Sequence, residues 1–507
     1  MYLQARIKRN PTVDEKHSTV GWSRRPTPTN HRSIVCVALC GHPTLCLFLL
    51  VVISFCFVST INAQSRVTIS IPNSGELRIE AEKLPPSHAW SFRNTYANAL
   101  GIAERIHEFK TFEDLSPIGE LNRTAVGEYR SNLAANKIVY SVKLSTAIST
   151  GWSHVSWLAE DRGYLMLADL VPIHPERFSL RFNLPAGWTV QSAIAPDEHG
   201  EFNVSDPLKS IFFVGRSLRK VSANLDGGVF DVVLSGKWSF KDGEAVKAAT
   251  RVMQKYLAIT GFKLPGKSMI MISPPPIQPK KNEWWAETRG STVALLIDPR
   301  GDALKGQLSV IFTHELLHLW VPNSLKLEGD YDWFFEGFTL YMALRMALDL
   351  DVIRFNEFLR TLGRAYDSYL LQPDDLSLIE ASERRWTTAG SQVYVKGMLV
   401  AFLYDLLARK ESNSKSTLED RYRELFSAGV AEHEQGNEVI MRVLGSSPAR
   451  VEFTRVYIES ARKVELERVL PAYGLQLDVS GKGSQLRVSR ALSGEQKQLL
   501  RSLGYRD

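Results

Sequence analysis

Residues 314–320 read His-Glu-Leu-Leu-His-Leu-Trp, and residues 333–339 read Trp-Phe-Phe-Glu-Gly-Phe-Thr. In the first segment two histidines stand four residues apart, so both rings point to one face of a helix and can bind the same metal ion. The flanking residues are apolar on nearly every side, which predicts a buried helix. Ionisable groups inside such a helix are costly unless a partner compensates them, and a divalent cation is the natural partner.

The second segment offers Glu336 as a third ligand. This acid stands alone among aromatic residues, with 17 residues between it and His318. Two histidines and one glutamate leave a fourth position for water, as in thermolysin-type zinc sites. Asp330 and Asp332 are alternative ligands, but they belong to a turn where we expect solvated side chains. The sequence therefore predicts one Zn²⁺ per chain, bound by His314, His318 and Glu336.

Glu315 is not a ligand in this arrangement, and we assign it as the general base. Zinc lowers the pKa of its water and polarises the carbonyl of the bond that breaks. Glu315 then takes the water proton and passes it to the leaving amine. The residues thus predict a zinc metallopeptidase. Because only catalysis requires Glu315, they argue against the alternative class, a binding or assembly factor built on a retired peptidase fold.

These segments resemble the glycyl aminopeptidase family of gluzincins. That family carries a tryptophan two residues after the second histidine and a third-ligand segment like Glu-Gly-Phe-Thr. Residues 394–397, Tyr-Val-Lys-Gly, resemble the Tyr-x-Lys-Gly helix of the same family. The resemblance implies that Tyr394 donates a hydrogen bond to the tetrahedral intermediate. The alternative is an ordinary tyrosine of an amphipathic helix.

A weaker match lies at residues 286–292, Ala-Glu-Thr-Arg-Gly-Ser-Thr, which resemble the family's Gly-Leu-Glu-His-Arg-Asn-Ser. It implies that Glu287 holds the free α-amine of a peptide substrate, which predicts an aminopeptidase. Trp285 and Thr288 replace the family's glycine and histidine, however. A solvated loop acid therefore remains an alternative, and so does an endopeptidase with Trp284 and Trp285 along an extended groove.

Periodicity predicts an α+β fold. Alternating segments at 67–71, 138–144, 179–184 and 229–234 predict an antiparallel β-sandwich domain over residues 64–240. Strands at 268–272 and 291–297 and many helices predict a thermolysin-like, mostly helical gluzincin catalytic domain over 241–475. A tail over 476–507 is expected to hold two strands and a helix, which is too short for the PDZ domain that the family often carries. The helices are expected at residues 244–259, 304–320, 332–349, 352–371, 391–410, 417–428, 436–444, 449–473 and 494–503.

Residues 1–63 differ from the rest of the chain. An apolar run at 45–58 follows several arginines and precedes Ala63, which suits a signal-peptidase cut. We expect a periplasmic or secreted protein, with a membrane anchor at residues 44–61 as the alternative. All four cysteines fall in this leader: Cys36, Cys40, Cys46 and Cys56. The cleaved chain would therefore have neither a disulfide nor a thiolate metal ligand.

The net charge gives no indication of an anionic partner. Seven basic and two acidic residues precede residue 64, so they supply +5 of the net +6 and leave about +1 for the body of the chain. A near-neutral body excludes an electrostatic argument for nucleic acid. We therefore expect a peptide substrate as the partner, and membrane contact only through an uncleaved leader.

Overall fold

A computed structural model describes residues 64–144, 151–173, 177–226, 228–301, 304–373, 375–427, 433–480 and 483–506. The expected leader, residues 1–63, lies outside the described residues, together with its cysteines. The described residues belong to one compact unit. None of their helices is long and apolar enough to cross a membrane.

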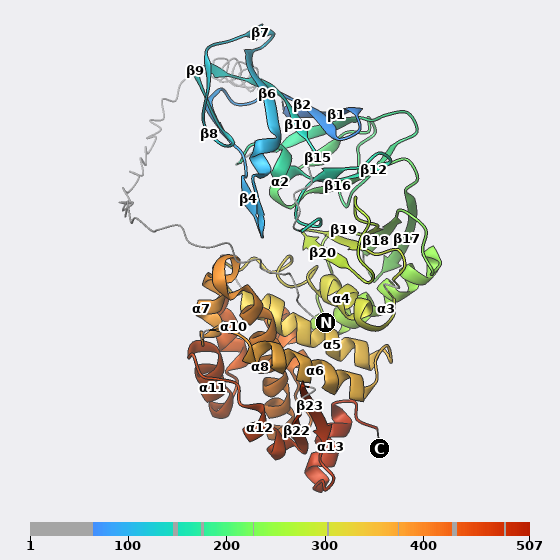
Figure 1. The fold of residues 1–507 in the computed structure, drawn as a ribbon, viewed down its shortest axis with the longest axis vertical. Coiled ribbons are helices and arrows are strands. Elements are labelled where there is room, and N and C mark those ends of the chain that lie inside the picture. Colours follow the sequence, from blue (N-terminus) through green and yellow to red (C-terminus); the bar gives the residue numbers. More distant parts are fainter. Residues whose placement is uncertain are drawn as a thin grey trace, which may run out of the picture. The chain divides into compact units, whose positions relative to one another are not determined.

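Two packed sheets form the amino-terminal part of the described chain (Figure 1). The larger has strand order β15-β13-β1-β2-β10-β6-β7 and the smaller β11-β12-β16-β14. Ile79 and Tyr140 of the larger sheet share a buried core with Leu165 and Phe212 of the smaller, which confirms the predicted sandwich. The strands are β1 Ser65–Asn73, β2 Glu76–Glu82, β6 Ile106–Glu113, β7 Ser116–Pro117, β10 Lys137–Lys143, β11 Trp157–Leu158, β12 Arg162–Met166, β13 Phe178–Asn183, β14 Thr189–Gln191, β15 Phe202–Val204 and β16 Ile211–Gly215.

One pair of strands departs from the expected antiparallel arrangement, because β1 and β13 run parallel. A long stretch of chain separates them, which allows the crossover connection that parallel strands require. A three-stranded sheet, β3-β9-β8, and a small hairpin, β4-β5, complete this region. Their bounds are β3 Ser87–Ser91, β4 Thr95–Tyr96, β5 Ala99–Leu100, β8 Leu121–Ala125 and β9 Glu128–Ala135.

A five-stranded mixed sheet of order β17-β18-β19-β21-β20 follows the sandwich. Its inner strands β19 and β21 carry apolar runs at residues 269–272 and 293–297, which is typical of strands buried on both faces. Side chains on one face, such as Met271 and Leu296, pack with Phe213 of the sandwich. Those on the other face, such as Ile272 and Leu295, pack with the helices. The bounds are β17 Arg219–Leu225, β18 Gly228–Leu234, β19 Lys267–Ser273, β20 Trp284–Arg289 and β21 Thr292–Ile297.

This sheet alters two expectations. The strand at 229–234 was expected in the sandwich, but as β18 it pairs in parallel with β19, so the sheet begins before residue 240. Glu287 was expected in a loop before the strand at 291–297, but residues 284–289 form β20, antiparallel to β21 at the edge of the sheet. The side chains of β20 are all half-buried, so this strand lacks the alternation of apolar and polar residues by which a strand is predicted.

Helices cover one face of the five-stranded sheet and make up most of the remaining chain (Figure 1). Two π-helical segments, η3 Trp333–Phe338 and η4 Arg385–Ala389, lead into α5 and α8. The α-helices beyond the sandwich are α3 Asp242–Thr260, α4 Gly306–Leu317, α5 Thr339–Asp349, α6 Phe355–Leu370, α7 Leu378–Glu383, α8 Gly390–Glu411, α9 Leu418–Ser427, α10 Gly436–Leu444, α11 Pro448–Thr454, α12 Leu466–Val469 and α13 Gly494–Ser502.

The single helix expected over 449–473 is wrong. The structure has α11, a π-helical turn at Arg455–Glu459 and then α12, with extended backbone at Ser460. Residues 460–463 are all exposed, so no apolar stripe holds a helix there.

The last described residues pack into the helical region. Strands β22 (Leu475–Ser480) and β23 (Gly483–Val488) form a hairpin, and β23 contacts α6. After α13, the carbonyl oxygen of Leu503 accepts a hydrogen bond from Arg345 Nη1 at 2.5 Å, and that of Ser502 from Arg409 Nη1 at 2.8 Å. Both arginines are buried, so the end of α13 satisfies donors inside the helical region.

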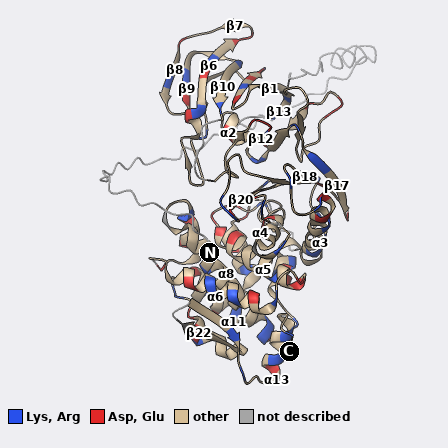
Figure 2. Cartoon of the chain, turned by 45° about the vertical axis from the view of Figure 1, so that its right-hand side comes forward, with Lys and Arg blue, Asp and Glu red and all other residues tan. Residues whose placement is uncertain are grey.

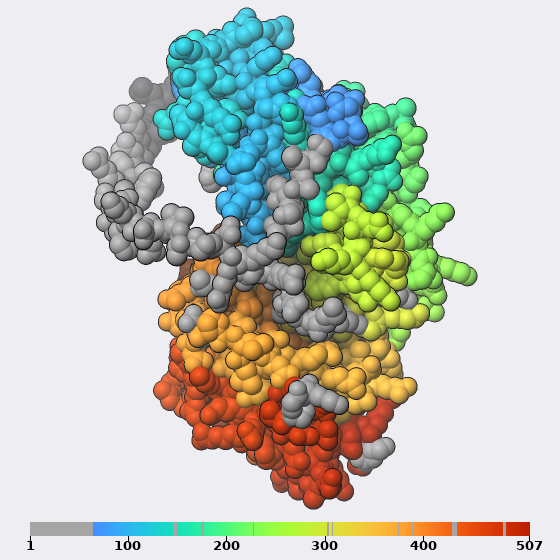
Figure 3. Space-filling view, in the orientation of Figure 1, coloured from blue at the N-terminus to red at the C-terminus, as the bar shows by residue number. Residues whose placement is uncertain are grey.

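Charged residues of both signs are spread along the described part of the chain, in agreement with the near-neutral charge of the body. In Figure 2 the Lys and Arg residues are interspersed with Asp and Glu over sheets and helices alike. In Figure 3 the green and yellow-green part of the chain lies between the teal part and the orange part, in keeping with the packing of the sheet on both of its faces. The sheet is therefore a middle layer between the sandwich and the helices.

Two glycines bring the two motif helices together. A Cβ at Gly337, in η3, would lie 2.5 Å from Gly397 Cα and 2.6 Å from the Val393 carbonyl oxygen, both in α8. A Cβ at Gly397 would lie 2.9 Å from Gly337 Cα. Backbone therefore touches backbone where the segment with Glu336 crosses the helix with Tyr394. The glycines of Glu-Gly-Phe-Thr and Tyr-Val-Lys-Gly are thus explained by packing.

We expect Gly397→Ala to destabilise the protein, because neither backbone can yield to the added methyl group. Overpacking of this kind costs about 1–3 kcal/mol. Gly243→Ala is the matched control, since Gly243 lies in α3 with nothing within 4 Å of the added Cβ. That variant should be neutral or stabilised by about 0.5–1 kcal/mol. Urea unfolding measures both, and equal stabilities of the two variants would contradict the packing argument.

Candidate metal centre

Helix α4 holds His314 and Glu315 in its buried length, and His318 is the residue that caps its C-terminus. The exposed fractions are 5% for His314, 7% for Glu315 and 6% for His318. The Nε2 atoms of the two histidines lie 3.0 Å apart. Oε2 of Glu336, in η3, lies 3.3 Å from His314 Nε2 and 3.4 Å from His318 Nε2. The structure thus brings together the three ligands that the sequence predicted.

The spacing of these three donor atoms suits zinc. Ligand bonds of about 2.0–2.1 Å in a tetrahedral site separate neighbouring donors by roughly 3.4 Å. The observed separations of 3.0–3.4 Å come close to that edge length. Among the described residues, this is the one group of three metal-ligating side chains gathered at such distances. The group can hold a metal ion, and its donor types fit zinc.

Backbone and hydroxyl oxygens orient the two imidazoles. His318 Nδ1 lies 2.8 Å from the Val321 carbonyl oxygen, which can only accept a hydrogen. Nδ1 of His318 therefore carries a proton, and Nε2 is the nitrogen that would bind a metal ion. His314 Nδ1 lies 3.5 Å from Thr339 Oγ1.

Glu315 is buried beside the ligands and contacts the edge strand. The Thr288 hydroxyl lies 2.8 Å from Glu315 Oε2 and 2.8 Å from the Glu315 carbonyl oxygen. Burial raises the pKa of Glu315, while the two histidines and Thr288 oppose the shift. Threonine replaces the histidine of the family pattern here, so the replacement gives the carboxylate a hydroxyl partner.

Arg385 joins the ligand set to Tyr394. Its Nη2 lies 2.6 Å from Glu336 Oε1 and 2.9 Å from the Tyr394 hydroxyl oxygen. Burial alone would raise the pKa of Glu336, but Arg385 and His318 outweigh it and hold this pKa well below its usual value. Glu336 is therefore an anion, as a metal ligand must be.

Asp332 was expected to have a solvated side chain, and this expectation is wrong. Its exposed fraction is 8%, and its carboxylate pairs with Nη1 of Arg385. It stands outside the group of three donors, whereas Asp330 is exposed as expected. Neither aspartate therefore competes for the ion.

Tyr394 lies within two hydrogen bonds of the predicted ligand Glu336, through Arg385. It is half-buried in α8, while the residues on both sides of it are buried. Burial raises its pKa well above the usual value, so the phenol remains protonated and can donate. The structure therefore places this side chain beside the metal centre.

Glu287 lies in β20 with a side chain that is 12% exposed, so the alternative of a solvated loop acid is wrong. Its Oε1 accepts a hydrogen bond from the Tyr96 hydroxyl at 2.7 Å, and its Oε2 contacts His154 Nδ1. Burial alone would raise the pKa of Glu287, but His154 and Arg289 lower it to about 2. An anionic carboxylate thus lies between the edge strand and loops of the sandwich region.

Tyr96 connects this carboxylate to a stack of cations. The guanidinium groups of Arg93 and Arg289 lie 4.3 Å and 4.4 Å from the centre of its ring. The ring also contacts Trp386, at 6.1 Å between centroids, and Trp386 is 52% exposed. The hairpin strand β4 therefore brings an aromatic side chain from the sandwich region to Glu287 and Trp386.

Sequence analysis did not identify Thr288, Arg385, His154 or Tyr96 as site residues. Thr288 was noted only as a departure from the family pattern. Arg385 belongs to no motif that would connect it with the metal ligands. His154 is 133 residues from Glu287, and Tyr96 is 191 residues from it. Contacts over such separations leave no periodic signal in the sequence.

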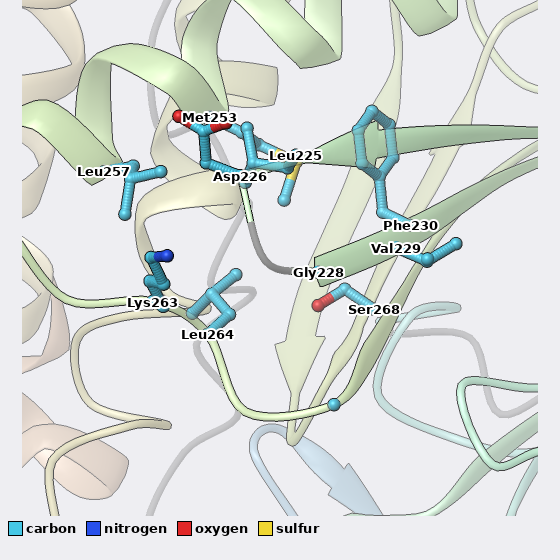
Figure 4. A pocket seen from close by; sticks show the side chains of 11 residues that line it. Leu225, Asp226, Gly228, Val229, Phe230, Met253, Leu257, Lys263, Leu264 and Ser268 are labelled. Atoms are coloured by element: carbon cyan, nitrogen blue, oxygen red, sulfur yellow. The ribbon is translucent and has the colours of Figure 1, made fainter.

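A separate small pocket lies away from the metal centre, between the ends of β17–β19 and helix α3 (Figure 4). Its walls are mainly apolar, with Leu225, Phe230 and Leu264 among them. Asp226 and Lys263 are the ionisable side chains among the described residues that line it. It offers no group of metal ligands.

The fold matches solved metallopeptidases. No family model matches the chain. The aminopeptidase N family protein of Idiomarina loihiensis superposes with a TM-score of 0.71 at 16% identity, over 82% of this chain and 79% of the other. The M1 zinc metallopeptidase of Deinococcus radiodurans gives 0.51 at 14% identity, over 79% and 94% of the two chains. The chain thus has the α+β fold of the M1 zinc metallopeptidases.

One curated relative is an aminopeptidase. The puromycin-sensitive aminopeptidase of Caenorhabditis elegans is 23% identical over 245 residues, which are 45% of this chain and 25% of the relative. The match therefore spans a quarter of the relative's length. In a further solved structure, a variant of the Deinococcus enzyme is bound to a Tyr-Ser-Ala substrate.

Proposed function

We propose that this protein is a zinc-dependent aminopeptidase. The observation that carries the proposal is the group of three donors, His314, His318 and Glu336, at tetrahedral spacing beside the buried Glu315. Hydrolysis of unblocked dipeptides by the purified protein, with zinc measured in the same sample, tests the proposal. Zinc-loaded protein that cleaves no peptide would favour the retired peptidase fold.

In this proposal each side chain has a separate task. A zinc ion in the site supplies a Lewis acid and lowers the pKa of a bound water. Glu315 accepts the water proton and delivers it to the leaving amine, and Thr288 fixes the orientation of its carboxylate. Tyr394 donates its hydrogen to the oxygen of the former carbonyl. The His318 contact to Val321 keeps the ligand nitrogen turned inward.

The similarity to known peptidases supports hydrolysis of peptide bonds as the reaction. The names of the structural relatives and of the curated relative describe zinc metallopeptidases and aminopeptidases, and one relative binds a tripeptide. Resemblance to the glycyl aminopeptidases rests on the residues quoted from the sequence. We propose a peptide substrate, and secretion or periplasmic export through the leader. Amino-terminal sequencing of the exported protein tests cleavage after Ala63 against an anchor at residues 44–61.

Glu287 is the residue that we propose for the substrate amine. Its oxygens already accept from Tyr96 and His154, but each carboxylate oxygen has two acceptor positions. Room therefore remains for one ammonium hydrogen bond. In a desolvated cleft such a bond contributes about 1.5–3 kcal/mol.

We expect Glu287→Ala to lower kcat/KM about 10–100-fold for unblocked dipeptides, because the ammonium loses its carboxylate. Acetylating the substrate amine should cost the wild type a similar factor and the variant almost nothing. This double comparison separates amine recognition from general damage to β20. Equal losses on acetylation in both proteins would mean that Glu287 does not bind the amine.

An endopeptidase on the same fold is the second candidate. The observation in its favour is that each oxygen of Glu287 already has a partner, Tyr96 or His154. A carboxylate held in this way can have a structural role and leave the substrate amine unbound. In that case, blocked peptides should be cleaved internally, with Trp284 and Trp285 of the half-buried edge strand along the groove. Internal cleavage of an acetylated, amidated peptide distinguishes the two candidates.

A further inference from the structure

We propose that Arg385 is a positioning residue that selects the ligand oxygen of Glu336 and aims the hydroxyl hydrogen of Tyr394 at the substrate. The inference rests on the proposed function, and it concerns a residue outside every motif quoted from the sequence. One nitrogen atom, Nη2, makes both contacts. This nitrogen carries two hydrogens and the phenol carries one.

Nη2 of a guanidinium has two hydrogens, and the structure uses both. One is donated to Glu336 Oε1 at 2.6 Å, the other to the Tyr394 hydroxyl oxygen at 2.9 Å. A bond from a cation to a carboxylate is among the stronger hydrogen bonds in proteins. Arg385 therefore holds the Glu336 carboxylate and the Tyr394 hydroxyl at once. A movement of either group shifts the guanidinium and, through it, the other group.

The contact with Glu336 divides its two oxygens between two partners. Oε1 faces Arg385, while Oε2 faces the two histidine nitrogens at 3.3 Å and 3.4 Å. With Oε1 turned to the guanidinium, Oε2 is the oxygen that the carboxylate turns toward the two histidine nitrogens. Arg385 would thus favour a carboxylate that binds an ion through Oε2 alone.

The contact with Tyr394 fixes the direction of its single hydrogen. Its oxygen accepts from Arg385, and a phenol that accepts at this position must turn its own hydrogen elsewhere. The hydrogen of Tyr394 is therefore left for an acceptor other than Arg385, which in the proposed reaction is the substrate oxygen. A free phenol would sample other orientations and lose part of its effect as a donor.

The guanidinium itself is held firmly. Nη1 pairs with the buried Asp332, and the guanidinium carbon lies 4.3 Å from the centre of the Trp386 ring. The Arg385 side chain is 11% exposed. Its planar fork cannot be reproduced by lysine, which offers one nitrogen on a flexible stem. Both substitutions, to glutamine and to lysine, should therefore disturb the arrangement.

The experiment compares Arg385→Gln and Arg385→Lys with Arg384→Gln. Arg384 is the exposed neighbour in the chain and serves as the matched control. We expect zinc affinity, measured by competition with a chelator, to fall about 10-fold in both Arg385 variants. On unblocked dipeptides, kcat should fall about 10–100-fold while KM changes less than about 3-fold. The control should match the wild type in every measurement.

A double variant tests whether Arg385 acts through Tyr394. If it does, Arg385→Gln should reduce kcat much less in a Tyr394→Phe background, which has no hydrogen to aim. Equal reductions in both backgrounds, or wild-type zinc affinity in both Arg385 variants, would overturn the inference. If Arg385→Gln fails to fold, the same comparison is made with Arg385→Lys. Wild-type protein without turnover would refute the proposed function instead, while the zinc competition would still test Arg385.

Discussion

Replacing Glu315 by glutamine is expected to abolish peptide hydrolysis while the protein keeps its zinc. Glutamine has the same shape but cannot accept the water proton, and a positioned base contributes about 10²–10⁴-fold. Glu315 lies outside the group of three donors, so the ion should stay. Turnover of unblocked dipeptides, together with the zinc content of the same sample, measures both effects.

The contact with Thr288 allows a control for misplacement. Thr288→Val keeps the carboxylate of Glu315 but removes its hydroxyl partner at 2.8 Å. That variant should lose much less activity than Glu315→Gln, because the base itself remains. A Glu315→Gln protein that stays active and zinc-loaded would show that another group accepts the proton, and the proposed mechanism would be wrong.

Tyr394→Phe is expected to lower kcat by about 10²–10³-fold with little change in KM, because the hydrogen bond is made mainly in the transition state. The phenol is protonated and lies two hydrogen bonds from Glu336. Tyr457→Phe is the matched control, since Tyr457 is also half-buried but contacts Phe453 in α11. Steady-state kinetics of both variants measure the effect, and equal kinetics would return Tyr394 to the role of an ordinary helix residue.

The ligand set could be predicted from the sequence because its chemistry is local. His314 and His318 share one helix face by spacing alone, and Glu336 stands out as an acid among aromatic residues. Helix α3 and strands β19 and β21 were predicted within a few residues for the same reason, since apolar periodicity decides them. Burial is the physical cause of both predictions, of the metal ligands and of these three elements.

Arg385 and the setting of Glu287 could not be predicted, because they depend on contacts between distant segments. Arg385 meets Glu336 across 49 residues, and Glu287 meets His154 across 133 residues. The place of β18 was missed for a related reason. Its apolar run predicts a strand, but only its pairing with β19 shows which sheet it joins.

Removal and return of zinc tests the central claim most directly. The purified protein is assayed on unblocked amino-acid p-nitroanilides before and after treatment with a chelator, and again after one equivalent of zinc is added. We predict that activity is lost with the ion and returns with it, and that a His318→Ala variant neither holds zinc nor recovers. Activity that survives complete removal of the metal, or that returns equally in His318→Ala, would contradict the account.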